Sequence, residues 1–169
     1  MSTRKISFTA MMAALVFTGT FFLKIPFPFG YTHLGDGLII LSVDLLGPAG
    51  GILAASIGAG LADLAGGYAI WVVPTAIIKG LWAACIGLSE YKLLKGKKSG
   101  YLPGAVAGGI LQCILYFLVK IPLYGLPEAV AEEPVLIGQT AAGLVIGAIL
   151  VSVFRRSRMT SKLHAMLAG

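Results

Sequence analysis

This chain of 169 residues is too apolar for an ordinary soluble domain. Hydrophobic residues make up 57% of it and charged residues only 12%, whereas a soluble domain usually carries about 25% charged residues. The formal net charge is +6, and its distribution along the chain, described below, indicates membrane topology and not nucleic-acid binding.

Apolar stretches predict six transmembrane helices. Uncharged runs at residues 6–23, 45–62, 101–119 and 134–154 approach the roughly 20 apolar residues that a helix needs to cross a bilayer. Residues 37–43 form a shorter run, and residues 68–94 contain one interior charge, Lys79. We predict an all-α integral membrane protein, a compact bundle in one domain over residues 1–169. The expected helices cover residues 5–24, 35–47, 49–65, 71–94, 102–121 and 135–155.

The first run is expected to be a retained helix, because it is longer than a signal-peptide core and no cleavage site follows it. Cys85 and Cys113 fall inside predicted helices and are expected to be small buried residues. No motif or spacing suggests a metal site, and no cofactor is expected.

Positive charges predict that both termini are cytoplasmic. If the six helices alternate, only Lys24 and Lys120 fall near the outside, and the acids after residue 127 cluster on an outer loop. This bias follows the positive-inside rule. The residues expected inside are Arg4, Lys5, Lys92, Lys95, Lys97, Lys98, Arg155, Arg156, Arg158 and Lys162.

Three aspartates, Asp36, Asp44 and Asp63, lie beside or inside apolar segments. Intramembrane acids are costly and usually face a bundle interior or a water-filled cavity. With the aromatic loop over residues 27–31, they predict a polar, aromatic pocket near one membrane face. No ATP-binding loop of the GxxxxGK[ST] type occurs, so energy for uphill transport would come from a partner or an ion gradient.

Ala10 and Ala14 place two small residues four positions apart near the cytoplasmic end of the first helix, where a partner subunit can dock. Further motifs lie at residues 30–36 (GYTHLGD), 45–48 (LLGP), 62–68 (ADLAGGY), 74–75 (PT) and 77–80 (IIKG). Together they resemble the substrate-binding S components of energy-coupling factor (ECF) vitamin transporters. The resemblance is to the branch that includes riboflavin, pantothenate and hydroxymethylpyrimidine or pyridoxine carriers.

The resemblance implies a multi-pass protein of a bacterial cytoplasmic membrane that captures a vitamin from outside. It would then dock, through Ala10 and Ala14, on an ECF module made of a transmembrane scaffold protein and two ATPases. The module would use ATP to topple the S component and release the vitamin inward. The chain itself would therefore not be an enzyme.

In such proteins the ligand lies near the outer face, under the loop after the first helix. Tyr31 and His33 are candidates on that loop, and His33 either binds a heteroaromatic ring or caps the next helix. Asp36 has the same alternatives, because the helix dipole favours an acid in a first turn, and we favour the structural role. Trp71 and Tyr68 can stack on a planar ligand, although aromatic belts favour the same positions.

Polar residues four positions apart extend this candidate site. Thr75 and Lys79 share one helix face with Trp71. Gln112 and Tyr116 form a ladder that rises toward Lys120 at the outer surface. Gln139 and Thr140, near the outer end of the last helix, can face the same cavity. Apolar walls with a few placed polar groups are typical of ligand pockets.

Lys79 decides between two classes of vitamin. It either pairs with Asp63 or Asp36, which we favour, or binds a ligand anion. An ion pair favours a neutral heteroaromatic such as hydroxymethylpyrimidine or pyridoxine, whereas pantothenate would need Lys79 or Lys120 for its carboxylate.

Two other classes of function stay open. A stand-alone secondary transporter or channel is expected to show inverted repeats or paired broken helices, and the sequence has no convincing repeat. An intramembrane enzyme needs two converging carboxylates, and Asp44 is predicted at the opposite face from Asp36 and Asp63. Copurification with two ATPases would separate an S component from both.

Overall fold

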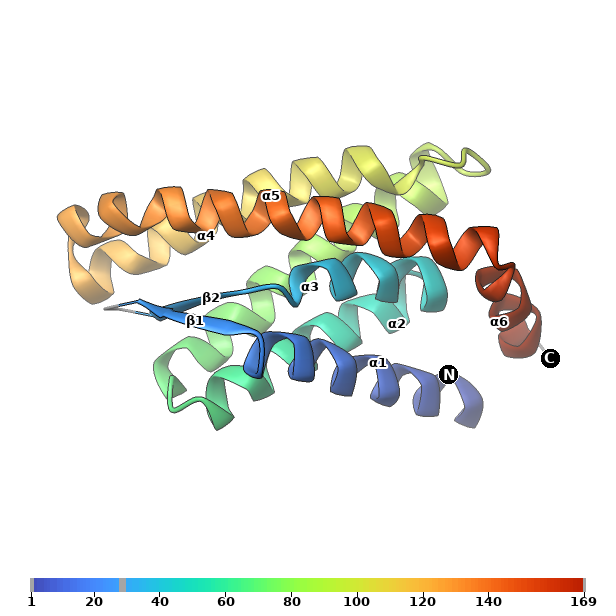
Figure 1. Ribbon diagram of the computed structural model, residues 1–169, viewed down its shortest axis with the longest axis horizontal. Helices are drawn as coiled ribbons and strands as arrows, with labels where there is room; N and C mark the ends of the chain where they lie inside the picture. The colour runs from blue at the N-terminus through green and yellow to red at the C-terminus, as the bar shows by residue number, and fades with distance from the viewer. Residues whose placement is uncertain (1, 28–29, 169) are drawn as a thin grey trace.

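Helices that run along the long axis of the molecule make up most of this computed structural model (Figure 1). It describes residues 2–27 and 30–168, without the side chains of residues 26, 27, 30–32 and 168. Both chain ends lie at one end of the bundle, and a β-hairpin lies at the other. The elements are α1 (Thr3–Phe21), β1 (Lys24–Phe27), β2 (Gly30–His33), α2 (Asp36–Ala65), η1 (Ala69–Trp71), α3 (Val72–Leu88), η2 (Ser89–Leu93), α4 (Tyr101–Tyr124), α5 (Leu126–Arg156) and α6 (Met159–Ala168).

Helix α2 is broken at Gly47, and its two limbs fold back on each other. Gly47 has φ of 75° and ψ of 179°, a backbone conformation that favours glycine, and Pro48 then lacks the N–H that would continue the helix. A Cβ on Gly51 would lie 2.7 Å from the Cα of Val43. In a straight helix these two residues would be about 12 Å apart. The limbs therefore correspond to the two helices predicted at residues 35–47 and 49–65.

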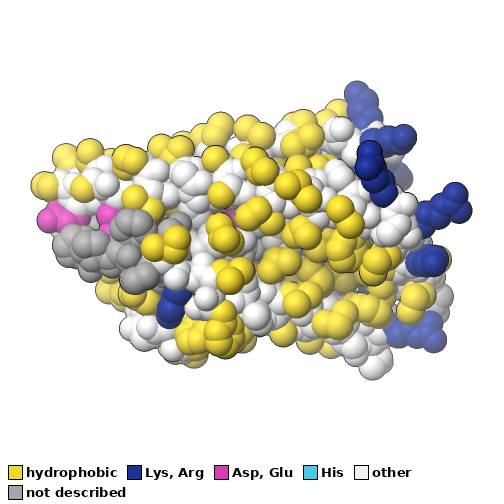
Figure 2. Space-filling view, viewed as in Figure 1, with side chains coloured by type: hydrophobic (Ala, Val, Ile, Leu, Met, Phe, Trp, Pro, Cys, Tyr) yellow, Lys and Arg dark blue, Asp and Glu magenta, His cyan; other side chains and the backbone are white. Residues whose placement is uncertain are grey.

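Within the described residues, four helical segments are long and apolar enough to cross a membrane: Asp36–Ala65, Ala69–Leu93, Tyr101–Tyr124 and Leu126–Arg156. Large apolar side chains also cover the outside of the bundle, as Figure 2 shows; Ile110 is 59% exposed and Ile149 is 58% exposed. Such a surface is unfavourable in water and favourable in lipid. In this view most lysines and arginines gather at the end where the chain termini lie. The chain is therefore a multi-pass membrane protein.

Three segments differ from the predicted boundaries. The chain on either side of the predicted aromatic loop forms two antiparallel strands, in which Lys24 pairs with His33; residues 28 and 29 of that loop lie outside the described residues. The expected outer loop at residues 121–134 is almost entirely helical, because α4 continues to Tyr124 and α5 begins at Leu126, with Gly125 between them. Pro127 there fits the first turn of a helix. Helix α6 was not predicted.

The core lies between α1, α2, α3 and α5. Val16, Ile39, Trp82 and Ile86 are fully buried in it. The indole N–H of Trp82 donates to the carbonyl of Ala105 at 2.9 Å, which satisfies its polar atom and ties α3 to α4. This apolar centre separates two buried polar clusters, one at each end of the first limb of α2.

Candidate functional site

The polar cluster beside the hairpin is built on an ion pair between Asp36 and Lys79. Both side chains are fully buried, and the Lys79 Nζ lies 2.6 Å from the Asp36 Oδ1. Of the two acids that the sequence offered as partners, the structure selects Asp36. Asp36 is the first residue of α2, where the helix dipole adds to the stabilisation of its charge.

Gln112 extends this cluster to α5. The Lys79 ammonium also donates to the Gln112 Oε1 at 2.9 Å, and the Gln112 Nε2 donates to the Thr140 hydroxyl at 2.7 Å. That hydroxyl in turn donates to the carbonyl of Leu136 at 2.8 Å. The Gln112 amide is thus held with its oxygen toward the ammonium, and each contact in this series from Lys79 to Leu136 is a single hydrogen bond.

Gln139 connects the hairpin to the same carboxylate. Its Oε1 accepts from the backbone N–H of His33 at 3.2 Å, and its Nε2 donates to the Asp36 Oδ2 at 2.9 Å. The backbone N–H of Gly35 donates to the His33 Nδ1 at 3.1 Å, so the neutral ring carries its hydrogen on Nε2. Burial lowers the pKa of His33 to about 4; the Asp36 charge opposes this shift and the Lys79 charge adds to it.

Aromatic side chains border the ion pair. The Trp71 indole N–H donates to the Tyr124 hydroxyl at 2.9 Å, and the Trp71 and Tyr116 ring centroids lie 5.7 Å apart. The Tyr116 hydroxyl donates to the Thr75 hydroxyl at 3.1 Å, and the Lys79 Nζ lies 5.6 Å from the Tyr116 ring centroid. Rings, amides and a neutralised charge therefore meet in one place.

The structure brings most of the predicted site residues together. The side chain of Tyr31 lies outside the described part of the chain, and Tyr68 is half-buried at the start of η1. Sequence reasoning missed Tyr124, although it continues the four-residue spacing of the α4 ladder by one further step. The residues brought together are His33, Asp36, Trp71, Thr75, Lys79, Gln112, Tyr116 and Gln139.

The second polar cluster lies at the end of the bundle where the chain termini lie. Arg155 forms ion pairs with both Asp44 and Glu90, and the Thr160 hydroxyl donates to the Asp44 Oδ2 at 3.0 Å. The Tyr91 hydroxyl donates to the Asp44 carbonyl at 3.2 Å, which the break at residue 47 leaves without a helical partner. The cluster thus joins α2, η2, α5 and α6.

Ala10 and Ala14 lie on the outside of the bundle, away from both clusters. They line a groove of about 650 Å³ between α1 and the second limb of α2, whose opposite wall includes Leu53, Ile57 and Leu61. Small residues on one side and larger apolar residues on the other leave room for an apolar helix.

Comparisons with known proteins agree with these features. The family model described as "ECF-type riboflavin transporter, S component" matches residues 1–156. A protein of Pyrococcus woesei, described as "Uncharacterized protein in gap 3'region", is 36% identical over 140 residues, which cover 81% of this chain and 92% of that protein. A solved structure described as "Structure and mechanism of the S component of a bacterial ECF transporter" has a TM-score of 0.65. It is 23% identical, with 94% of this chain and 97% of that chain covered, and so shows the fold.

Proposed function

Because the chain belongs to the family of ECF-type riboflavin transporter S components, we propose that it captures a small water-soluble vitamin and delivers it through an ATP-driven ECF module. The observation that carries this proposal is the cluster around Asp36 and Lys79. It lies beside the hairpin, where β2 leads into α2. The cluster offers both stacking surfaces and hydrogen-bonding groups.

The proposed ligand is a neutral, planar heteroaromatic molecule. Asp36 already neutralises Lys79 at 2.6 Å, so a ligand carboxylate such as that of pantothenate would have to compete with it. The amides of Gln112 and Gln139 each offer donor and acceptor atoms, and Trp71 and Tyr116 offer ring faces. Hydroxymethylpyrimidine and pyridoxine fit this chemistry. Riboflavin is a further candidate ligand, because the family is named for riboflavin transport.

A vitamin panel tests the choice of ligand. Purified protein is titrated with hydroxymethylpyrimidine, pyridoxine, riboflavin and pantothenate, by calorimetry and, for riboflavin, by fluorescence quenching. We expect one neutral heteroaromatic to bind at least about tenfold more tightly than pantothenate, which is a difference in binding free energy of about 1.4 kcal/mol. Tightest binding of pantothenate would contradict the role given to the Asp36–Lys79 pair.

The proposed docking surface is the groove that contains Ala10 and Ala14, and its partner is the transmembrane scaffold of the module. Six membrane spans would comprise α1, the two limbs of α2, and α3 to α5. The concentration of lysines and arginines at the end with both termini supports a cytoplasmic position for that end.

A bulky substitution tests docking separately from binding. Ala10→Trp and Ala14→Trp would fill the groove, so copurification with the scaffold and ATPases and vitamin uptake should be lost, while vitamin affinity is kept. Ala107→Trp is the matched control, because Ala107 is exposed on α4 and does not line this groove. Uptake by the chain alone, without the ATPases, would instead favour a stand-alone transporter.

A further inference from the structure

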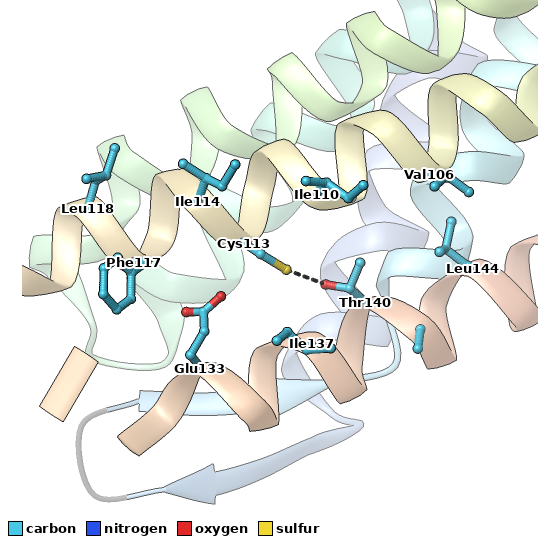
Figure 3. Close-up of a pocket in the computed structure, with 12 residues that line it drawn as sticks. Val106, Ile110, Cys113, Ile114, Phe117, Leu118, Glu133, Ile137, Thr140 and Leu144 are labelled. Atoms are coloured by element: carbon cyan, nitrogen blue, oxygen red, sulfur yellow. Dashed lines mark hydrogen bonds between the residues drawn. The ribbon is translucent and has the colours of Figure 1, made fainter. Parts of the chain in front are cut away.

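A second groove, of about 610 Å³, runs along the outside of the bundle between α4 and α5 (Figure 3). Its walls are almost entirely apolar and include Ile110, Phe117 and Leu144. At its floor the Cys113 sulfur lies 3.5 Å from the Thr140 hydroxyl. Lipid would surround this face of the protein, so the groove is open to membrane lipids.

Glu133 is the charged exception among the residues that line this groove. Its side chain points into the space between α4 and α5, beside Phe117 (Figure 3). Its Oε2 atom is buried and forms no hydrogen bond. Lys120 of α4 forms its ion pair with the neighbouring Glu132 at 3.2 Å, and its charge acts on Glu133 without a hydrogen bond to the buried oxygen. Because a buried carboxylate oxygen without a donor is costly, the groove calls for a cationic donor from outside the chain.

The position of Glu133 along α5 matches a lipid headgroup. Glu133 and Arg155 lie 22 positions apart on this helix, or about 33 Å at 1.5 Å per residue. That is close to the thickness of the hydrocarbon core, about 30 Å. With Arg155 at one headgroup level, Glu133 lies at the other. Leu144, near the far end of the groove, is about 16 Å from Glu133 along α5, which is the depth of one leaflet.

We propose that this groove binds one lipid of the leaflet on the hairpin side, with a primary ammonium headgroup on the Glu133 carboxylate. Its acyl chain lies along Phe117, Ile110 and Leu144. Phosphatidylethanolamine has the required chemistry, because its ammonium donates hydrogen bonds. The quaternary ammonium of phosphatidylcholine carries the same charge but has no N–H to donate.

Competition between these two lipids with identical acyl chains tests the proposal. Purified protein in detergent is mixed with equal amounts of both, and the retained lipid is counted by native mass spectrometry. We expect retention of phosphatidylethanolamine to exceed that of phosphatidylcholine by about tenfold, as hydrogen bonds to a charged group predict. In Glu133→Gln the preference should fall to within about twofold.

Two further variants distinguish the contribution of the lipid headgroup to binding from that of the apolar groove. Glu128→Gln removes another acid from the same end of α5 outside the groove and should keep the full preference. Ile137→Trp fills the groove and should reduce retention of both lipids. Equal retention of the two lipids by the unmodified protein would overturn the proposal, and so would a preference that survives in Glu133→Gln.

Discussion

The two buried polar clusters differ in how their charges are held. Asp36 and Asp44 lie on the same limb of α2, about two turns apart. Asp36 meets the ammonium of Lys79 and the amide of Gln139, each through a single hydrogen bond, and the same ammonium also donates to the amide of Gln112. Asp44 meets the guanidinium of Arg155, which also binds Glu90 and the carbonyl of Lys98.

This difference distinguishes a cluster that holds chain segments together from a cluster whose hydrogen bonds can be exchanged for bonds to a ligand. A guanidinium presents several donors in a rigid plane, so Arg155 fixes four chain segments in one geometry. An ammonium and amides can rotate, and each can exchange one protein partner for a ligand atom of the same kind. We therefore infer that the Asp44 cluster holds the bundle together and that the Asp36 cluster binds ligand.

Removing Arg155 should have the largest effect on stability. Arg155→Met leaves Asp44, which is 1% exposed, and Glu90 as uncompensated acids. Losing one partner of a buried pair costs about 3–5 kcal/mol, and two acids depend on this arginine. Thermal unfolding in detergent measures the loss. The triple variant Arg155→Met, Asp44→Asn, Glu90→Gln should recover much of it, and no recovery would mean that packing dominates.

Removing Lys79 should have a smaller effect, because this ammonium pairs with the single acid Asp36, to which Gln139 still donates. We expect Lys79→Met to lower the free energy of unfolding by about 3 kcal/mol, and Asp36→Asn in the same chain to restore much of this loss. Stability is measured as for Arg155. Unchanged stability with lost vitamin binding would make Lys79 a ligand contact and would move pantothenate ahead of the neutral vitamins.

Changes to the ladder on α4 should affect binding more than stability. Gln112→Leu and Tyr116→Phe each remove one proposed hydrogen bond to the ligand, worth about 1–3 kcal/mol, or about ten- to a hundredfold in affinity. Titration calorimetry measures this loss, and both variants should still assemble with the ECF module. Thr160→Val, in the Asp44 cluster, is the control that should bind normally. Undiminished affinity in both ladder variants would place the site elsewhere.

The change with the smallest effect at neutral pH is that of His33, which contributes a pH dependence of stability only below pH 6.5. Its pKa is about 4 in the folded protein against an ordinary value of 6.5, so below pH 6.5 the unfolded chain binds a proton that the folded chain does not. The free energy of unfolding should therefore fall as the pH falls from 6.5 to 4, by at most about 1.4 kcal/mol per pH unit. Unfolding curves for the unmodified protein and His33→Asn should diverge over this range and coincide above it. Parallel curves would mean that His33 titrates normally.

The membrane class, the family resemblance and most residues of the candidate site could be predicted from the sequence alone. Long apolar runs show directly which segments suit lipid. Charged and strongly polar groups within these runs are costly enough in lipid that Asp36, Lys79 and Gln112 are recognisable as interior residues from the amino-acid sequence alone. The four-residue spacing of Trp71, Thr75 and Lys79 likewise follows from helix geometry. Their role in binding a vitamin stays a prediction.

Only the tertiary structure decided which charges meet. Asp36 and Asp63 were equal partners for Lys79 on sequence grounds, because helical spacing does not say how one helix is rotated against another. The pairing of Asp44 with Arg155 joins residues far apart in the chain, and the backbone break at Gly47 sets where the first limb of α2 ends. Local patterns fix which residues a helix must bury, whereas close packing between helices fixes which of them touch.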